Sequence, residues 1–139
     1  IVPRTIRLAL RDEAPTIRSD GFYKRDYCYV RNIADAYLTL AEQMETVGCY
    51  GEAFNFGSQF PLTVFELVDR ILANMEKRHL LPQVHNTATG EIKHQWLDCT
   101  KARDRLGWMP IYTLDQGLEA TIAWYTHYLL KEEAYAGTT

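Results

Sequence analysis

The sequence predicts an α/β fold within one domain. Apolar residues recur at helical spacing in several stretches, and short segments rich in aromatic and β-branched residues alternate with them. Glycine, proline and aspartate mark the junctions between these stretches. The length of 139 residues and the 47% hydrophobic content suit one globular domain with a core of its own.

The N-terminal part is expected to hold one helix and two strands. Proline is tolerated in the first turn of a helix, so Pro3 fits the start of the first one. A residue that precedes proline is pushed towards extended geometry, which ends this helix before Pro15. The expected elements are a helix at 3–10, a strand at 16–18, a turn at 19–21 and a strand at 23–30.

The strand at 23–30 carries the first indication of a ligand. Alternation places Arg25, Tyr27 and Tyr29 on one face. A guanidinium beside aromatic rings can bind an anion, because its planar fork matches phosphate oxygens. The alternative is that Arg25 forms an ordinary ion pair with Asp26 or Asp35.

The central part is expected to contain two helices and a strand. Asn32 can cap the first helix, whose apolar stripe includes Tyr37 and which ends near Gly48. Residues 51–58 are expected to form a strand, with Asn55 hydrogen-bonded to the loop that follows. Thr63-Val64-Phe65-Glu66 is a capping box at the start of the second helix.

The C-terminal part is expected to contain both extended segments and helices. A second capping box, Thr113-Leu114-Asp115-Gln116, opens the last helix, and Gly107 ends the small helix before it. The expected elements are a strand at 83–85, a polar turn at 86–91, an extended segment at 92–97, helices at 98–106 and from 113, and a loose tail at 134–139.

Composition excludes several classes of function. A net charge of −3 argues against a nucleic-acid surface, and no stretch is long and apolar enough for a membrane span. Without a signal-peptide pattern, we expect a soluble, cytoplasmic protein. The three cysteines show no CxxC pair and are expected to be reduced, and the four histidines lack metal-ligand spacing.

No catalytic constellation can be assembled from these residues. The chain has no GxGxxG after a strand and no Gly-x-Ser-x-Gly elbow. It opens at Ile1 without methionine, and Val2, Ile6 and Ala9 already have helical spacing, so we expect a fragment of a larger chain. The residues by themselves support an α/β domain with a possible anion site at Arg25.

The order of five motifs nevertheless resembles a known family. The motifs are Pro15-Thr16-Ile17-Arg18-Ser19-Asp20-Gly21, Arg25-Asp26-Tyr27-Cys28-Tyr29-Val30, Gly51-Glu52-Ala53-Phe54-Asn55-Phe56-Gly57-Ser58, Leu97-Asp98-Cys99-Thr100-Lys101-Ala102-Arg103 with Leu106-Gly107-Trp108-Met109-Pro110, and Gly117-Leu118 with Thr121-Ile122-Ala123-Trp124-Tyr125. Together they resemble the C-terminal half of NAD-dependent sugar-nucleotide epimerases and dehydratases, the extended short-chain dehydrogenase/reductases. Within that family they look most like CDP-glucose 4,6-dehydratases.

The resemblance implies roles for five residues. Arg25 would hold the diphosphate of a nucleotide-diphosphate sugar, and the strand of Thr16, Ile17 and Arg18 would lie along the base. Where the epimerases of the family have Arg-x-Gly-Asp or Arg-x-Gly-Glu, this chain has Ala88-Thr89-Gly90-Glu91, so only Glu91 could reach the ribose. The missing arginine weakens the interpretation as a UDP-galactose epimerase.

The resemblance also implies what this chain lacks. The family's glycine-rich turn for NAD or NADP and its Tyr-x-x-x-Lys pair lie N-terminal to the part that resembles this chain, so neither catalytic nor cofactor-binding residues are expected here. The expected fold is the C-terminal substrate-binding portion of an extended Rossmann-type enzyme, and the parent enzyme would be a homo-oligomer. A sugar-nucleotide 4-epimerase, or a stand-alone nucleotide-sugar-binding or protein-binding module, remains an alternative.

Overall fold

The structure is a computed structural model that describes residues 1–136, and the elements of this part confirm the α/β class. Helices account for most of the ordered backbone, and every strand is only two residues long. The helices are α1 (Val2–Leu10), α2 (Val30–Val47), α3 (Val64–Asn74), α4 (Thr100–Leu106) and α5 (Leu114–Ala136), and the strands are β1 (Thr16–Ile17), β2 (Lys24–Arg25), β3 (Leu62–Thr63), β4 (Gln83–Val84) and β5 (His94–Gln95).

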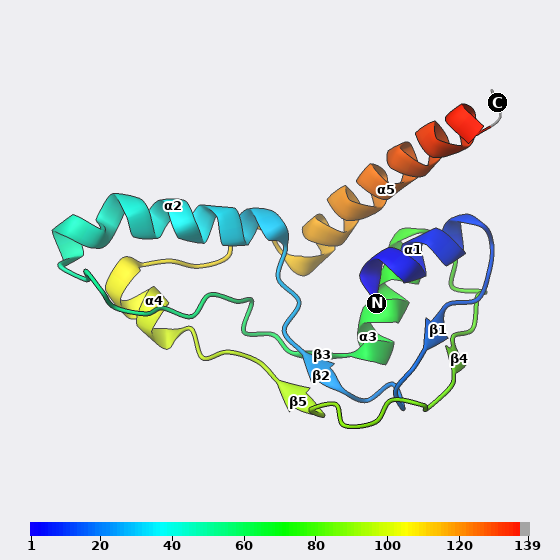
Figure 1. The fold of residues 1–139 in the computed structure, drawn as a ribbon, viewed down its shortest axis with the longest axis horizontal. Helices are drawn as coiled ribbons and strands as arrows, with labels where there is room; N and C mark the ends of the chain where they lie inside the picture. Colours follow the sequence, from blue (N-terminus) through cyan, green and yellow to red (C-terminus); the bar gives the residue numbers. More distant parts are fainter. Residues whose placement is uncertain (137–139) are drawn as a thin grey trace.

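The strands form two small sheets that join distant parts of the chain. β1 pairs in parallel with β4, and Thr16 lies opposite Gln83. β2 is the central strand of the other sheet, antiparallel to β3 and parallel to β5. Figure 1 shows β2, β3 and β5 at the lower middle of the molecule, and β1 and β4 at the right, beside α1 and α3. These pairings bring the segments around residues 17, 25 and 91 into one region.

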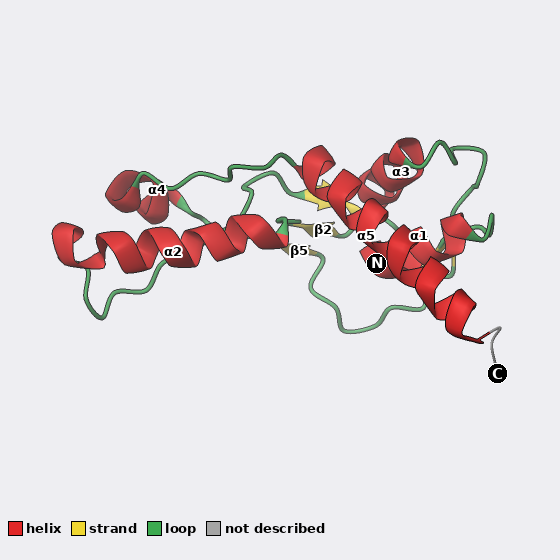
Figure 2. Ribbon diagram, turned by 90° about the horizontal axis from the view of Figure 1, so that it is seen from above, coloured by secondary structure: helices red, strands yellow, loops and turns green. Residues whose placement is uncertain are grey.

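The buried residues gather around two groups of helices. α1, α3 and the first turns of α5 share a core that includes Ile6, Leu67, Ile71 and Leu118. At the other end of the molecule, α2 and α4 lie side by side, as both ribbon views show, and they enclose Ala36, Ala102, Leu106 and Trp108. β2 and its neighbours connect these two groups (Figure 2).

The predicted strand at 23–30 is shorter than expected. Only Lys24–Arg25 is a strand, and α2 begins at Val30, two residues before the predicted cap. Asn32 therefore caps nothing. It lies inside the first turn, 2% exposed, and its side chain bonds the backbone of Tyr112. Tyr37 was also wrongly assigned to the core-facing stripe of this helix, because it is 71% exposed.

The predicted strand at 51–58 is wrong as well. This segment has no strand partner in the described part of the chain, and a strand requires a neighbour to bond its backbone groups. Its aromatic residues pack instead, because Phe56 meets Trp108 edge-on with ring centroids 5.0 Å apart. Asn55 donates to the carbonyl of Asp98, a loop far along the chain, rather than to the loop that follows it.

Local signals at helix ends predicted the structure well. Both capping boxes are confirmed, since the Thr63 side chain accepts from the Glu66 N–H and the Thr113 side chain accepts from the Gln116 N–H. α2 and α4 end where glycine was expected, each at a residue with left-handed backbone geometry. Of the expected tail, residues 134–136 belong to α5, and 137–139 lie outside the described residues.

Candidate functional site

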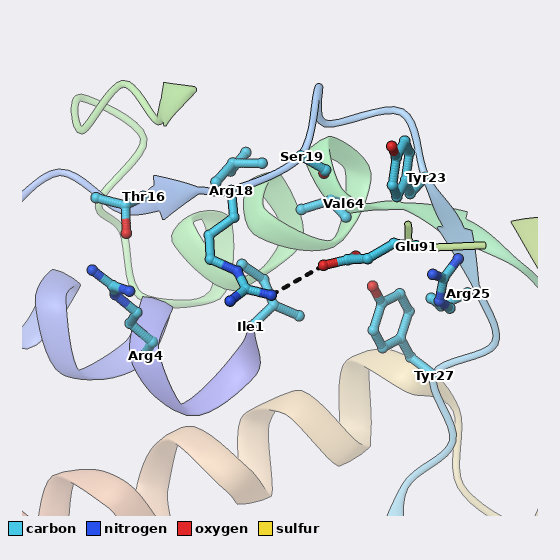
Figure 3. A pocket seen from close by; sticks show the side chains of 11 residues that line it. Ile1, Arg4, Thr16, Arg18, Ser19, Tyr23, Arg25, Tyr27, Val64 and Glu91 are labelled. Atoms are coloured by element: carbon cyan, nitrogen blue, oxygen red, sulfur yellow. Dashed lines mark hydrogen bonds and ion pairs between the residues drawn. The ribbon is translucent and has the colours of Figure 1, made fainter. Parts of the chain in front are cut away.

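All five residues assigned to substrate binding from the sequence line one open pocket. Thr16, Ile17, Arg18, Arg25 and Glu91 surround a cavity of about 270 Å³ between α1, β1, β2 and the start of α3. Figure 3 shows these side chains together with their neighbours. The pocket is also lined by Ile1, Arg4, Ser19, Tyr23, Tyr27 and Val64.

Backbone pairing brings Glu91 to this pocket from far along the chain. The β1–β4 pairing continues past Ile17, because His85 N–H donates to the Ile17 carbonyl. The next two N–H groups in reach, those of Thr87 and Ala88, both donate to the carbonyl of Arg18. The polar turn that follows is thus anchored on β1, and Glu91 lies opposite the Arg18 side chain.

Arg18 and Glu91 form an ion pair across the pocket. Their closest nitrogen and oxygen atoms are 3.0 Å apart, and the two side chains are 73% and 38% exposed (Figure 3). A pair this exposed contributes roughly 0–1 kcal/mol, because water screens it and both side chains lose freedom. A ligand that offers an anion to Arg18 or a hydroxyl to Glu91 can therefore replace it at small cost.

Arg25 does not form the ion pair considered as the alternative from the sequence. Its Nη1 donates to the carbonyls of Lys24 and Lys93, and its Nη2 donates to the carbonyl of Ile92. The two candidate carboxylates bond elsewhere: Asp26 accepts from the N–H groups of Ser58 and Gln59, and Asp35 accepts from Nε1 of Trp108.

The bonds of Arg25 hold it in place and leave part of its fork unused. A guanidinium has donors on Nε, Nη1 and Nη2, and within the described residues the Nε–H and one Nη2–H of Arg25 have no acceptor. Its positive charge also has no carboxylate partner there. A fixed, unneutralised guanidinium with donors to spare is well suited to a phosphate.

Tyr27 shares the pocket with Arg25, as the alternation predicted, but Tyr29 does not. Burial raises the pKa of the Tyr27 phenol, and the positive charge of Arg25 opposes this rise. The phenol is therefore protonated at neutral pH and presents an O–H donor. Tyr29 instead packs edge-on against Tyr112, with centroids 5.5 Å apart, because the strand ends at Arg25 and its alternation stops there.

The sequence did not identify Arg4 and Tyr23 as parts of this pocket. Arg4 comes from the first turn of α1, where the residue spacing showed only which side of the helix is apolar. It reaches the pocket because α1 packs beside β1 through the core that contains Ala9 and Ile17. No local sequence pattern predicts that Arg4 lies at this pocket, because α1 and β1 come together only through tertiary packing.

The described residues offer no metal-binding cluster. Among them, no three His, Cys, Asp or Glu side chains could hold a metal ion together. Burial raises the pKa of the Cys28 and Cys99 thiols, so neither is a ready nucleophile, and the cysteines are free as expected. Within the part that the structure describes, no helix is both long and apolar enough to span a lipid bilayer.

The motif order and the fold agree with comparisons to known proteins. The family model for GDP-mannose 4,6 dehydratase matches residues 1–121. The chain belongs to this family. Its homologues include nucleotide-sugar 4,6-dehydratases and 4-epimerases of the extended short-chain dehydrogenase/reductase type.

Curated relatives of the family cover most of this chain. The dTDP-glucose 4,6-dehydratase of Haemophilus influenzae is 32% identical in an alignment of 138 positions that covers 90% of this chain and 39% of that enzyme. The enzyme of the same name from Xanthomonas campestris pv. campestris is 28% identical, over 90% of this chain and 37% of its own length. The chain thus spans about two fifths of the length of these relatives.

Solved structures of the family share the fold. UDP-glucose 4-epimerase from Thermotoga maritima, in complex with UDP-glucose, is 29% identical with a TM-score of 0.78, over 92% of this chain and 40% of that one. The dTDP-glucose 4,6-dehydratase of Bacillus anthracis, in complex with NAD, is 25% identical with a TM-score of 0.78, over 91% and 38%. Both confirm the extended short-chain dehydrogenase/reductase fold predicted from the sequence.

The described residues include no glycine-rich loop between a strand and a helix. NAD binding in this fold class uses a glycine-rich loop between a strand and a helix N-terminus. Here α3 follows β3 directly through Thr63, and the segment between β2 and α2 contains no glycine. No contact to NAD is therefore assigned to this chain.

Proposed function

We propose that this chain is the nucleotide-sugar-binding portion of an NAD-dependent nucleotide-sugar 4,6-dehydratase. One observation carries the proposal: the residues singled out by family resemblance, which lie up to 75 positions apart, line a single pocket that holds three arginines and one glutamate. A positively charged pocket on a chain whose net charge is −3 favours an anionic ligand.

Each part of a nucleotide sugar has a matching group in this pocket. The unused donors of Arg25 and the phenol of Tyr27 suit the diphosphate, which offers acceptors only. The Glu91 carboxylate suits the ribose hydroxyls, since it accepts hydrogen bonds. The short strand of Thr16 and Ile17 would lie along the base. Redox chemistry at the sugar would be supplied by NAD, which structural neighbours contain.

A 4-epimerase is the second candidate, because solved structures of that activity share this fold at up to 29% identity. The absent arginine before Gly90 still favours the dehydratase interpretation. CDP-glucose, expected from the sequence, has no support from the relatives named here, which are dTDP- and UDP-sugar enzymes by name. We also propose a cytoplasmic location and a homo-oligomeric parent enzyme; the free cysteines support the former.

The proposal is tested by calorimetric titration of the protein in its natural full length. Four nucleotide sugars, namely UDP-glucose, dTDP-glucose, CDP-glucose and GDP-mannose, are compared with glucose and with inorganic phosphate. We expect saturable 1:1 binding of at least one nucleotide sugar and none of glucose at the same concentration. If the protein binds none of the four, the proposal is wrong. Subsequent turnover with NAD separates a 4-keto-6-deoxy product from a C4 epimer.

A further inference from the structure

Arg25 is held in place by the chain segment that carries Glu91. Its Nη1 donates to the carbonyl of Lys93, and its Nη2 donates to the carbonyl of Ile92, the residue that follows Glu91. The Lys93 carbonyl also accepts from the N–H of Lys24, the neighbour of Arg25 on β2, at 2.8 Å. The groups proposed for the diphosphate and for the ribose therefore depend on one short stretch of backbone.

The same stretch is anchored on β1 at its other end. The N–H groups of Thr87 and Ala88 both donate to the carbonyl of Arg18, at 2.7 and 3.1 Å. Figure 3 shows Glu91 reaching across the pocket toward Arg18. Three residues, 89–91, lie between this anchor and the carbonyls that hold the guanidinium. A change in the backbone of this span therefore moves Glu91, the carbonyls, or both.

Gly90 lies in the middle of this span and has left-handed backbone geometry, with φ at +71°. A Cβ at this position would meet no other described residue within 4 Å beyond its chain neighbours, so space does not require glycine here. The backbone does, because a side chain disfavours positive φ, most strongly when it branches at Cβ. A β-branched residue would push the backbone toward negative φ, and Glu91 and Ile92 would shift with it.

We propose that Gly90 is a positioning residue that couples the phosphate contact of Arg25 to the ribose contact of Glu91. Its left-handed turn sets the direction of the Glu91 side chain and, through the carbonyls of Ile92 and Lys93, the orientation of the guanidinium. Each contact with a ligand then holds the segment in the geometry that the other contact needs. The inference rests on the proposed function, which supplies the diphosphate and the ribose.

The probe is UDP-glucose, titrated calorimetrically into the unaltered full-length protein, Gly90→Val, Gly90→Asn and the control Gly51→Val. Asparagine tolerates left-handed geometry better than most residues with a side chain, so Gly90→Asn tests the backbone requirement itself. Gly51 is matched in geometry: its φ is +73°, a Cβ there also has open space around it, and it does not line the pocket. Circular dichroism establishes that each variant is folded.

We expect folded Gly90→Val to bind UDP-glucose about tenfold more weakly than the unaltered protein, and Gly90→Asn and Gly51→Val to bind it within about twofold. The same change is then made in Arg25→Lys, whose ammonium lacks the planar fork that joins two carbonyls to a phosphate. In that background Gly90→Val should weaken binding by no more than about threefold, because the path through the guanidinium is already broken.

Two results would overturn the coupling while leaving nucleotide-sugar binding intact. An equal loss in both backgrounds would show that Gly90 does not act through Arg25. Binding by Gly90→Val as tight as that by Gly51→Val would show that the left-handed turn does not position either contact. If the unaltered protein does not bind UDP-glucose, the coupling is wrong for that ligand, and the proposed function then depends on the other three nucleotide sugars.

Discussion

Asn32 and Tyr112 are joined by two hydrogen bonds although 80 positions separate them. The Asn32 amide nitrogen donates to the Tyr112 carbonyl, and the Tyr112 N–H donates to the Asn32 amide oxygen, each at 2.9 Å. Asn32 is 2% exposed, so water does not replace these bonds. The pair fixes the start of α2 against the chain that leads into α5.

Asn32→Leu should therefore destabilise the protein by about 2–4 kcal/mol, because it leaves both backbone groups of Tyr112 without a partner. Asn32→Asp should also destabilise the protein, since its carboxylate still accepts from the Tyr112 N–H but places a second oxygen against the Tyr112 carbonyl. The measurement is the free energy of unfolding in urea, with Asn74→Ala as control. Asn74 is exposed on α3 and bonds only the carbonyl of Arg70, one turn earlier. An Asn32→Leu protein as stable as Asn74→Ala would show that the pair contributes little.

Thr63→Ala should lower stability by about 1 kcal/mol, because the capping box of α3 loses the side chain that accepts from the Glu66 N–H. Thr89→Ala is the matched control, since Thr89 is exposed in a loop. Chemical denaturation measures both. If Thr63→Ala and Thr89→Ala have the same free energy of unfolding, the cap at Thr63 does not stabilise the protein.

The same box should make stability depend on pH. Hydrogen bonds from Thr63 lower the pKa of Glu66 below its ordinary value. A lowered folded-state pKa means that this stabilisation is present above the ordinary glutamate pKa, about 4.3, and is lost as the pH falls through the folded value. The difference in stability between the unaltered protein and Thr63→Ala should therefore shrink on acidification from pH 6 to about pH 3. A difference that stays constant over this range contradicts the assignment.

The sequence predicted the elements whose signals are local. The Thr63–Glu66 box and the glycine at position 48 act within one helical turn, so their effect can be read directly from neighbouring residues. Residues 51–58 have strand-like composition, yet pairing needs a second strand that this chain does not provide in its described part. Composition cannot report the presence of a partner.

In the site, too, residues with a local sequence signal were predicted, and residues placed by distant contacts were not identified from their own pattern. Arg25 was identified because charge and aromatic character occur together in a few consecutive residues. Arg18 and Glu91 were assigned by resemblance, and their 3.0 Å ion pair depends on the β1–β4 pairing. Arg4 was missed because its place in the pocket follows from helix packing alone.

The 139-residue chain by itself should not convert nucleotide sugars in the presence of NAD. Hydride transfer needs a cofactor held by a dinucleotide-binding fold, and the described residues do not provide one. The chain is incubated with NAD and UDP-, dTDP- or CDP-glucose, and the products are followed for a 4-keto sugar. Formation of that product would mean that these residues contain redox machinery that the account does not include.

The same 139-residue chain should self-associate through α2. Val30, Tyr37 and Leu38 are 70%, 71% and 62% exposed, and their spacing places them on one face of the helix. Sedimentation velocity measures the self-association, and binding of an apolar dye measures the exposed apolar surface. Leu38→Glu should reduce both, whereas Gln43→Glu, which adds the same charge on another side of α2, should not. A monomer that binds no dye at high concentration contradicts the prediction.

The central claim is that Arg25 holds the diphosphate of a nucleotide sugar. Its guanidinium is fixed by the carbonyls of Lys24, Ile92 and Lys93 and retains unused donors, so a charge-assisted fork to phosphate should contribute roughly 1.5–3 kcal/mol. Arg25→Lys keeps the charge without the planar fork and should recover only part of this energy. Arg78→Ala is the control, since Arg78 pairs with Asp69 on the surface and does not line the pocket.

The most direct test is titration of UDP-glucose into the full-length protein and its Arg25→Ala, Arg25→Lys and Arg78→Ala variants, with circular dichroism to establish that each is folded. The account predicts that folded Arg25→Ala binds about 10- to 150-fold more weakly, that Arg25→Lys is intermediate, and that Arg78→Ala binds like the unaltered protein. If folded Arg25→Ala binds UDP-glucose as tightly as the unaltered protein does, Arg25 does not bind the diphosphate and serves only to hold the backbone at Ile92 and Lys93.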